Sequence, residues 1–267
     1  MTDAASAPIR LLAAEAIARE AGALMRRRFF DGSFKVAFKG PQDYLTEVDG
    51  ETEELISKRL RAAFPDDGFI GEETAARESG EGAAVWVVDP IDGTSNFARG
   101  APHFCVSIAC LLGVRVEVGV IYDPMRDELF SAVRGGGARL NGATIQASGA
   151  TALANSAIEV GWSAREGADR YLDIVRRVAL SGAAPSRTGS GALAIAYVAA
   201  GRSDGYVEQH IKAWDCLAGV LLVREAGGYV SDFLTGGGLA KGAPLIACAP
   251  GVKDALVAAV AIEGIVL

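Results

Sequence analysis

The pattern of apolar residues changes near residue 145, and this change limits the folds open to the chain. Before that point, β-prone apolar runs follow one another with short connections, at residues 84–88, 104–112, 116–122 and 128–133. Such runs predict a largely antiparallel sheet. After it, strand-like segments such as 157–160 alternate with helix-like segments such as 169–180, which is typical of α/β architecture. We therefore predict a mixed α and β fold, with an N-terminal α+β half over residues 1–145 and a C-terminal α/β half over residues 146–267.

Two helices are predicted before the first sheet. The first thirty residues are rich in Ala, Leu, Arg and Glu, and residues 45–64 place apolar side chains at helical spacing. That apolar face comprises Leu45, Val48, Leu55, Ile56, Leu60 and Ala63. Asp49 lies in the same sector, and a carboxylate facing the interior needs a partner or a chemical purpose. An ion pair with a neighbouring base such as Arg59 is the alternative.

Composition excludes several classes of protein. The formal net charge of −7 argues against a basic face for direct binding of nucleic acid. Four scattered cysteines and two histidines disfavour a zinc cluster and indicate free thiols. No apolar run is long enough to span a bilayer, and the N-terminus lacks the pattern of a signal peptide. We expect a cytoplasmic protein.

The segment from Trp86 to Asn96 carries the most chemical information. An apolar strand ends at Asp89, and Pro90 is predicted to stop the strand. Asp92 follows three residues later, then Gly93 for a tight turn, and three residues suited to capping a helix: Thr94, Ser95 and Asn96. Two carboxylates on one turn suit Mg²⁺, and N–H groups at a helix start suit a phosphate. The alternative interpretation is an Asp-Pro turn followed by a capped helix.

This segment resembles the central motif of the inositol monophosphatase family of lithium-sensitive, Mg²⁺-dependent phosphatases. Two further blocks match in order and spacing, Gly71-Glu72-Glu73 and Trp214-Asp215 leading into 225–228. Chemistry alone does not decide between Glu72 and Glu73 as a ligand, or between a ligand and a helix cap for Asp215. The resemblance favours Glu72 and the ligand role of Asp215. It also implies a layered α-β-α-β-α sandwich.

The resemblance further implies how the site is assembled. Glu72, Asp89 and the backbone carbonyl of Ile91 would hold a first Mg²⁺. Asp89, Asp92 and Asp215 would hold a second, and a third, weaker ion would lie near Glu72, giving two to three ions per subunit. The catalytic pair Thr94 and Asp49 would orient and deprotonate a water, while N–H groups at Gly93 and Thr94, with Ser95 beside them, would bind the phosphate.

The implied substrate is a small polyol monophosphate, most simply inositol-1-phosphate, with no membrane or nucleic-acid partner. Glu208 matches an acid that accepts hydrogen bonds from ring hydroxyls in the family, and Gly189-Ser190 matches a segment lining the substrate pocket. Histidinol phosphate and fructose 1,6-bisphosphate remain alternatives on the same scaffold. A regulatory protein that docks on the transcription machinery is an alternative of another class. A homodimer is expected from the resemblance.

Overall fold

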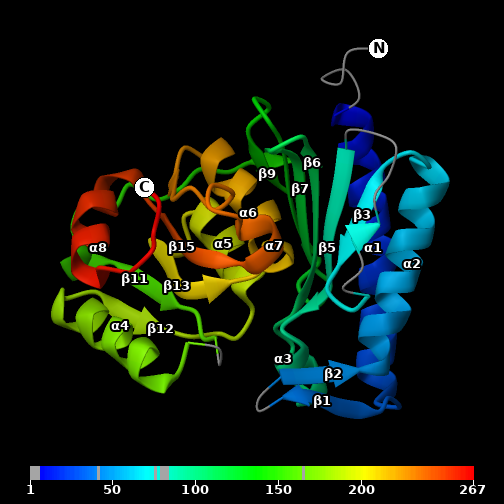
Figure 1. Cartoon of the computed structure of the whole chain (residues 1–267), viewed down its shortest axis with the longest axis horizontal. Helices are drawn as coiled ribbons and strands as arrows, with labels where there is room; N and C mark the ends of the chain where they lie inside the picture. Colours follow the sequence, from blue (N-terminus) through cyan, green and yellow to red (C-terminus); the bar gives the residue numbers. More distant parts are fainter. Residues whose placement is uncertain (1–6, 41–42, 75–76, 79–83, 164–165) are drawn as a thin grey trace.

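The computed structural model describes residues 7–40, 43–74, 77–78, 84–163 and 166–267. These residues form five layers, in which two sheets alternate with three pairs of helices (Figure 1). The predicted mixed fold and its α-β-α-β-α layering are confirmed. Among the described residues, no helix combines the length and apolar character needed to cross a membrane.

The larger sheet has eight strands and comes entirely from the part of the chain before residue 145. In spatial order they are β10 (Ala143–Thr144), β9 (Ala138–Leu140), β8 (Glu128–Val133), β7 (Arg115–Asp123), β6 (Cys105–Leu112), β5 (Ala84–Asp92), β3 (Gly68–Gly71) and β4 (Arg77–Glu78). Neighbouring strands are antiparallel except β3 and β5, which pair in parallel. The largely antiparallel sheet is therefore confirmed.

Helices α1 (Ala7–Asp31) and α2 (Glu47–Ala63) cover the outer face of this sheet (Figure 1). The predicted start of the second helix at Leu45 is wrong, because Leu45 belongs to a hairpin made by β1 (Val36–Gly40) and β2 (Asp43–Thr46). Thr46 ends the hairpin and caps α2, with its hydroxyl oxygen accepting the N–H of Val48. Ala63, the last residue of the predicted apolar face, is exposed.

The smaller sheet is built from the chain after residue 156. Its strands, in spatial order, are β12 (Ala184–Ser186), β11 (Ala157–Val160), β13 (Gly205–Ile211), β15 (Ala243–Cys248) and β14 (Tyr229–Val230). The first three are parallel and the last two antiparallel to their neighbours, so this half is only partly of α/β type. Helices α4 (Ala168–Leu180) and α8 (Lys253–Val260) cover its outer face.

Helices α5 (Gly191–Ala199) and α6 (Ala213–Glu225) lie between the two sheets and contact both. Because each helix is enclosed, their buried residues occur on every side rather than on one stripe. Close packing depends on small residues: a Cβ added to Gly119 of β7 would lie 2.6 Å from the carbonyl oxygen of Ala218. The division into two domains near residue 145 stays a prediction.

Candidate active site

Strand β5 continues past Pro90, so the predicted stop there is wrong. Asp89 pairs with Ser107 of β6 and Asp92 with Cys105, so the β5 segment between them holds one residue more than the β6 segment. This β-bulge accommodates the missing N–H of Pro90. Ser107 and Cys105 are two residues apart and so lie on one face of the sheet. The bulge therefore puts Asp89 and Asp92 on the same face as well, as a shared site requires.

Three carboxylates from separate elements converge beside this bulge. One oxygen each from Glu72, Asp89 and Asp215 lies within 4.8 Å of the other two. Glu72 directly follows β3, and Asp215 is the third residue of α6, where its carboxylate accepts the N–H of Lys212 at 3.2 Å. Asp215 is thus both a cap and a member of the cluster. Of the two neighbouring glutamates, Glu72 and not Glu73 belongs to this group among the described residues.

Burial and mutual repulsion make this cluster a strong candidate for a cation. Burial, with Glu73 and Asp49 nearby, raises the pKa of Glu72 to about 7 despite the ammonium of Lys39. The pKa values of Asp89 and Asp215 are raised well above the usual range by burial, and then by the charge of Glu72. An all-oxygen set of crowded carboxylates is the donor chemistry that Mg²⁺ prefers. The residues present therefore fit a divalent cation.

Asp49 and Thr94 form a hydrogen-bonded pair at the edge of the cluster. The Thr94 hydroxyl lies 2.9 Å from Oδ1 of Asp49 and 2.8 Å from the carbonyl oxygen of Ile91. The other carboxylate oxygen accepts the N–H and hydroxyl of Thr46, at 2.8 and 2.6 Å. Burial raises the pKa of Asp49. The alternative ion pair is absent among the described residues, because Arg59 binds Glu20 at 2.6 Å.

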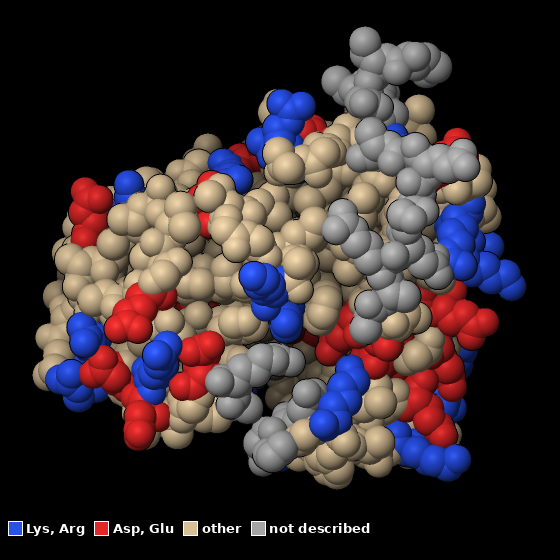
Figure 2. Space-filling model, in the orientation of Figure 1, with Lys and Arg blue, Asp and Glu red and all other residues tan. Residues whose placement is uncertain are grey.

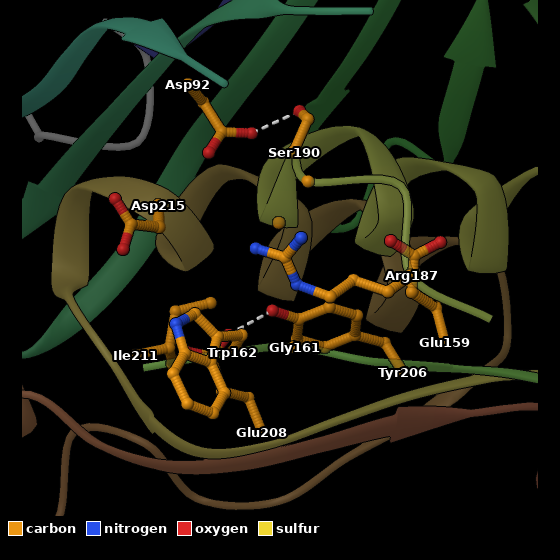
Figure 3. Close-up of a pocket in the computed structure, with 12 residues that line it drawn as sticks. Asp92, Glu159, Gly161, Trp162, Arg187, Ser190, Tyr206, Glu208, Ile211 and Asp215 are labelled. Atoms are coloured by element: carbon orange, nitrogen blue, oxygen red, sulfur yellow. Dashed lines mark hydrogen bonds between the residues drawn. The ribbon is translucent and has the colours of Figure 1, made fainter. Parts of the chain in front are cut away.

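Asp92 lies close to the cluster but is oriented differently. Its Oδ2 accepts the hydroxyl of Ser190 and the N–H of Ala192, the latter at 2.8 Å, at the start of α5 (Figure 3). Ser190 is the N-cap of that helix, so a residue predicted to line the substrate pocket also orients a predicted ligand. Asp92 is not part of the group of three carboxylates found among the described residues.

The N-cap of helix α3 (Thr94–Ala98) lies one residue before the predicted capping residues. Gly93 is the N-cap, with φ of 98°, whereas Thr94 and Ser95 are already helical. A Cβ on Gly93 would also lie 3.0 Å from the carbonyl oxygen of His103. Both the positive φ and this close contact therefore favour glycine at the position. The first N–H groups of any helix have no acceptor within it, and Thr94 and Ser95, which carry two of them here, line the cavity of the site.

The site opens into a cavity of about 390 Å³ between the two halves, seen as a recess in the lower part of Figure 2. It is lined by the predicted residues Glu72, Asp89, Ile91, Asp92, Gly93, Thr94, Ser95, Gly189, Glu208 and Asp215. Asp49 is fully buried behind Thr94. The structure thus brings all the predicted site residues to one region, although they come from both halves of the chain.

A second, smaller cavity of about 130 Å³ adjoins the first around Glu208 (Figure 3). Glu208 of β13 accepts the hydroxyl of Tyr206, and both pack against Gly161, where a Cβ would overlap them. Trp162 and Arg187 also line this cavity and were not predicted. They come from loops without a regular pattern, so the sequence offered no signal for them.

Comparison with known proteins connects this geometry to described relatives. A family model described as the inositol monophosphatase family matches residues 9–264. A protein of Escherichia coli K12 named Nus factor SuhB is 42% identical over 244 residues, covering 90% of this chain and 91% of its own. The crystal structure of the extragenic suppressor protein suhB from Bartonella henselae has a TM-score of 0.89 at 37% identity, covering 94% of this chain and 98% of its own. The Thermotoga maritima IMPase has a TM-score of 0.84 at 33% identity, with coverage of 94% and 96%.

Proposed function

Because the chain belongs to the inositol monophosphatase family, we propose that it hydrolyses a small polyol monophosphate with Mg²⁺, inositol-1-phosphate being the first candidate. One observation carries this proposal: the oxygens of Glu72, Asp89 and Asp215 converge within 4.8 Å beside the start of α3. A metal and a phosphate would be neighbours there, as metal-assisted ester hydrolysis requires.

The ligand assignment is part of the proposal. Glu72, Asp89 and the carbonyl oxygen of Ile91 would hold one ion, and Asp89, Asp92 and Asp215 would hold another, with a third near Glu72. Bound Mg²⁺ would activate a water and offset the negative charge of the phosphate and the departing alkoxide. The raised pKa values of these acids support the assignment, because burial and then mutual repulsion raise them, and a nearby cation favours the charged carboxylates.

Thr94 and Asp49 are proposed to move the proton of the attacking water. If the Thr94 hydroxyl donates to Asp49, 2.9 Å away, its oxygen is free to accept a hydrogen bond from water. The raised pKa of Asp49 makes its carboxylate a better base than an exposed one. Thr46 holds the other carboxylate oxygen and so fixes the direction of the pair.

The substrate is proposed to extend from the start of α3 toward β13. The N–H groups of Gly93, Thr94 and Ser95 receive the phosphate. The leaving alcohol enters the smaller cavity, where Glu208 accepts hydrogen bonds from its hydroxyls and Gly189 and Ser190 form the opposite wall.

An assay of purified chain on a panel of phosphate esters tests the proposal. We expect turnover of inositol-1-phosphate that depends on Mg²⁺, stops with EDTA and is lost in Asp49→Asn. Phosphate release that persists in EDTA, or no release from any ester at saturating Mg²⁺, would refute it.

Histidinol phosphate is a second candidate because the smaller cavity has a second buried acid. Glu159 of β11 lines it together with Glu208, and burial raises the pKa of Glu159. A cationic amine would lower the cost of burying such a charge. Rapid cleavage of histidinol phosphate beside negligible cleavage of inositol-1-phosphate would favour this candidate.

We also propose a non-catalytic role, since relatives at 42% identity carry the name Nus factor. In this role the chain docks, as a homodimer, on a protein of the transcription machinery. Sedimentation of the purified chain tests the dimer. A pull-down with Asp92→Asn separates docking from catalysis, and the absence of any stable transcription protein would count against it.

A further inference from the structure

We propose that Glu53 is a positioning residue that sets the direction of Glu72, and this inference rests on the proposed use of Glu72 as a metal ligand. Glu53 is a carboxylate inside the protein, with 2% of its surface exposed. Its two oxygens accept backbone N–H groups on the segment that carries Glu72. Oε2 accepts that of Glu73 at 2.8 Å, and Oε1 accepts that of Thr74 at 2.9 Å.

These two hydrogen bonds take the place of strand-to-strand hydrogen bonds at the point where the chain leaves the sheet. Gly71 pairs with Val88 in the parallel ladder, and the N–H of Glu72 still reaches the carbonyl oxygen of Val88 at 3.2 Å. Beyond Glu72 the chain turns away from β5. A side-chain carboxylate then binds the next two N–H groups, and the orientation of the Glu72 backbone is fixed from both sides.

The contact leaves the carboxylate little room to move. A Cβ on Gly71 would overlap the carboxyl group of Glu53, so the close approach of α2 to the end of β3 requires glycine there. Because interiors are closely packed, a carboxylate held between a helix and a strand end transmits its position to its partners.

Helix α2 thereby holds two parts of the site at a fixed distance from each other. Asp49 and Glu53 are four residues apart on its buried face, which corresponds to a rise of about 6 Å. The first contacts Thr94, and the second orients the segment of Glu72. One rigid helix turn therefore sets the distance between the proposed base and a proposed metal ligand.

Titration of Mg²⁺ into metal-free protein, followed by calorimetry, tests this role without relying on turnover. Glu53→Gln keeps one acceptor but places an amide nitrogen against an N–H group. We expect its dissociation constant for Mg²⁺ to rise about tenfold or more, the usual effect of losing a group that orients a ligand. The rate at saturating Mg²⁺ should stay within about twofold of wild type, because the reacting groups are intact.

Two further variants distinguish the effect of the position of the Glu53 carboxylate from the effect of its charge. Glu53→Asp keeps the charge but shortens the reach, so we expect the same weakening of Mg²⁺ binding. Glu54→Gln removes an exposed charge from the same helix and should leave the affinity unchanged. If Glu53→Gln does not fold, the more conservative Glu53→Asp supplies the test on its own.

The inference is overturned if Glu53→Gln and Glu53→Asp both bind Mg²⁺ within about twofold of wild type, or if Glu54→Gln weakens binding equally. A loss of maximal rate that extra Mg²⁺ does not restore would also overturn it. Failure of the wild-type chain to bind Mg²⁺ at all would instead refute the proposed function.

Discussion

Raising the pH from 6 to 8 should destabilise the metal-free protein and strengthen its stabilisation by Mg²⁺. The group responsible is Glu72, whose pKa is about 7 in the folded chain against a reference of 4.5. A carboxyl with a raised pKa favours the folded state only while it is protonated. Stability is therefore lost as the pH rises from about 4.5 to about 7, and Asp89 and Asp215 act in the same direction.

The size of the effect follows from the two pKa values of Glu72. Over its whole range the difference corresponds to about 3 kcal/mol. Between pH 6 and pH 8, the linkage relation gives a loss of about 1 kcal/mol in the free energy of unfolding. For a chain of this length, that lowers the midpoint of thermal unfolding by about 2 °C. Mg²⁺ should reverse the trend, because protons compete with it for the same carboxylates.

Urea unfolding at pH 6 and pH 8, with EDTA or with saturating Mg²⁺, measures these differences. Glu72→Gln removes the titrating group and should show a much smaller pH dependence, whereas Glu54→Gln alters an exposed acid of α2 and should resemble wild type. A metal-free wild type whose free energy of unfolding rises between pH 6 and pH 8 would refute the reasoning. So would an equal pH dependence in wild type and Glu72→Gln.

Three other changes test separate parts of the site. Asp92→Asn should abolish turnover while the unfolding midpoint stays near wild type, and near-full activity would remove Asp92 from the mechanism. Gly93→Ala should lower the free energy of unfolding in urea by about 1–2 kcal/mol because of its positive φ, and by a further amount because the added Cβ would press on the His103 carbonyl oxygen. Gly100 also has a positive φ but lies in open space, so Gly100→Ala should show only the first effect. Equal losses of stability in the two variants would contradict the effect of the His103 contact. Millimolar lithium should inhibit hydrolysis by competing at a Mg²⁺ site, and an unaffected rate at saturating substrate would contradict this.

The helices, strands and turns that the sequence predicts well are those with a regular spacing of apolar residues or with residues that clearly end an element. Strands β8 and β11 match their predicted bounds, and α4 differs by a single residue at its start. The Asn141-Gly142 turn joins β9 to β10 as its type suggests. In each case residues close in sequence determine the local structure, so the sequence pattern is sufficient to predict it.

Sequence pattern fails where long-range contacts decide the conformation. The hairpin of β1 and β2 was not predicted, because four of the five residues of β1 are exposed and give no alternation of buried side chains. The bulge at Pro90 depends on pairing with β6. The hydrogen bond from Ser190 to Asp92 joins residues 98 positions apart, and no local pattern indicates it.

The carboxylates converge for a topological reason. In the larger sheet, β3 and β5 are the parallel pair, so the chain runs off β3 beside Asp89 rather than at the opposite edge. The register of Gly71 with Val88 then puts Glu72 next to Asp89. Helix α6 starts at the same place and brings Asp215, and the positive ends of α5 and α6 favour the negative charge gathered there.

The smaller cavity is arranged differently, because most of its walls come from β11, β13, the loop after β11 and the loop before α5, although Asp92 and Asp215 also line it. Apart from Asp92, none of its lining residues belongs to the β3–β5 pair that gathers Glu72 and Asp89. Changes at Glu159, Trp162 or Arg187 can therefore alter which alcohol fits while the carboxylate cluster keeps its geometry. Exchanging Glu159 for Gln should change the relative rates on cationic and neutral phosphate esters but not the affinity for Mg²⁺. A parallel change in both quantities would show that substrate choice and metal binding are not separable in this chain.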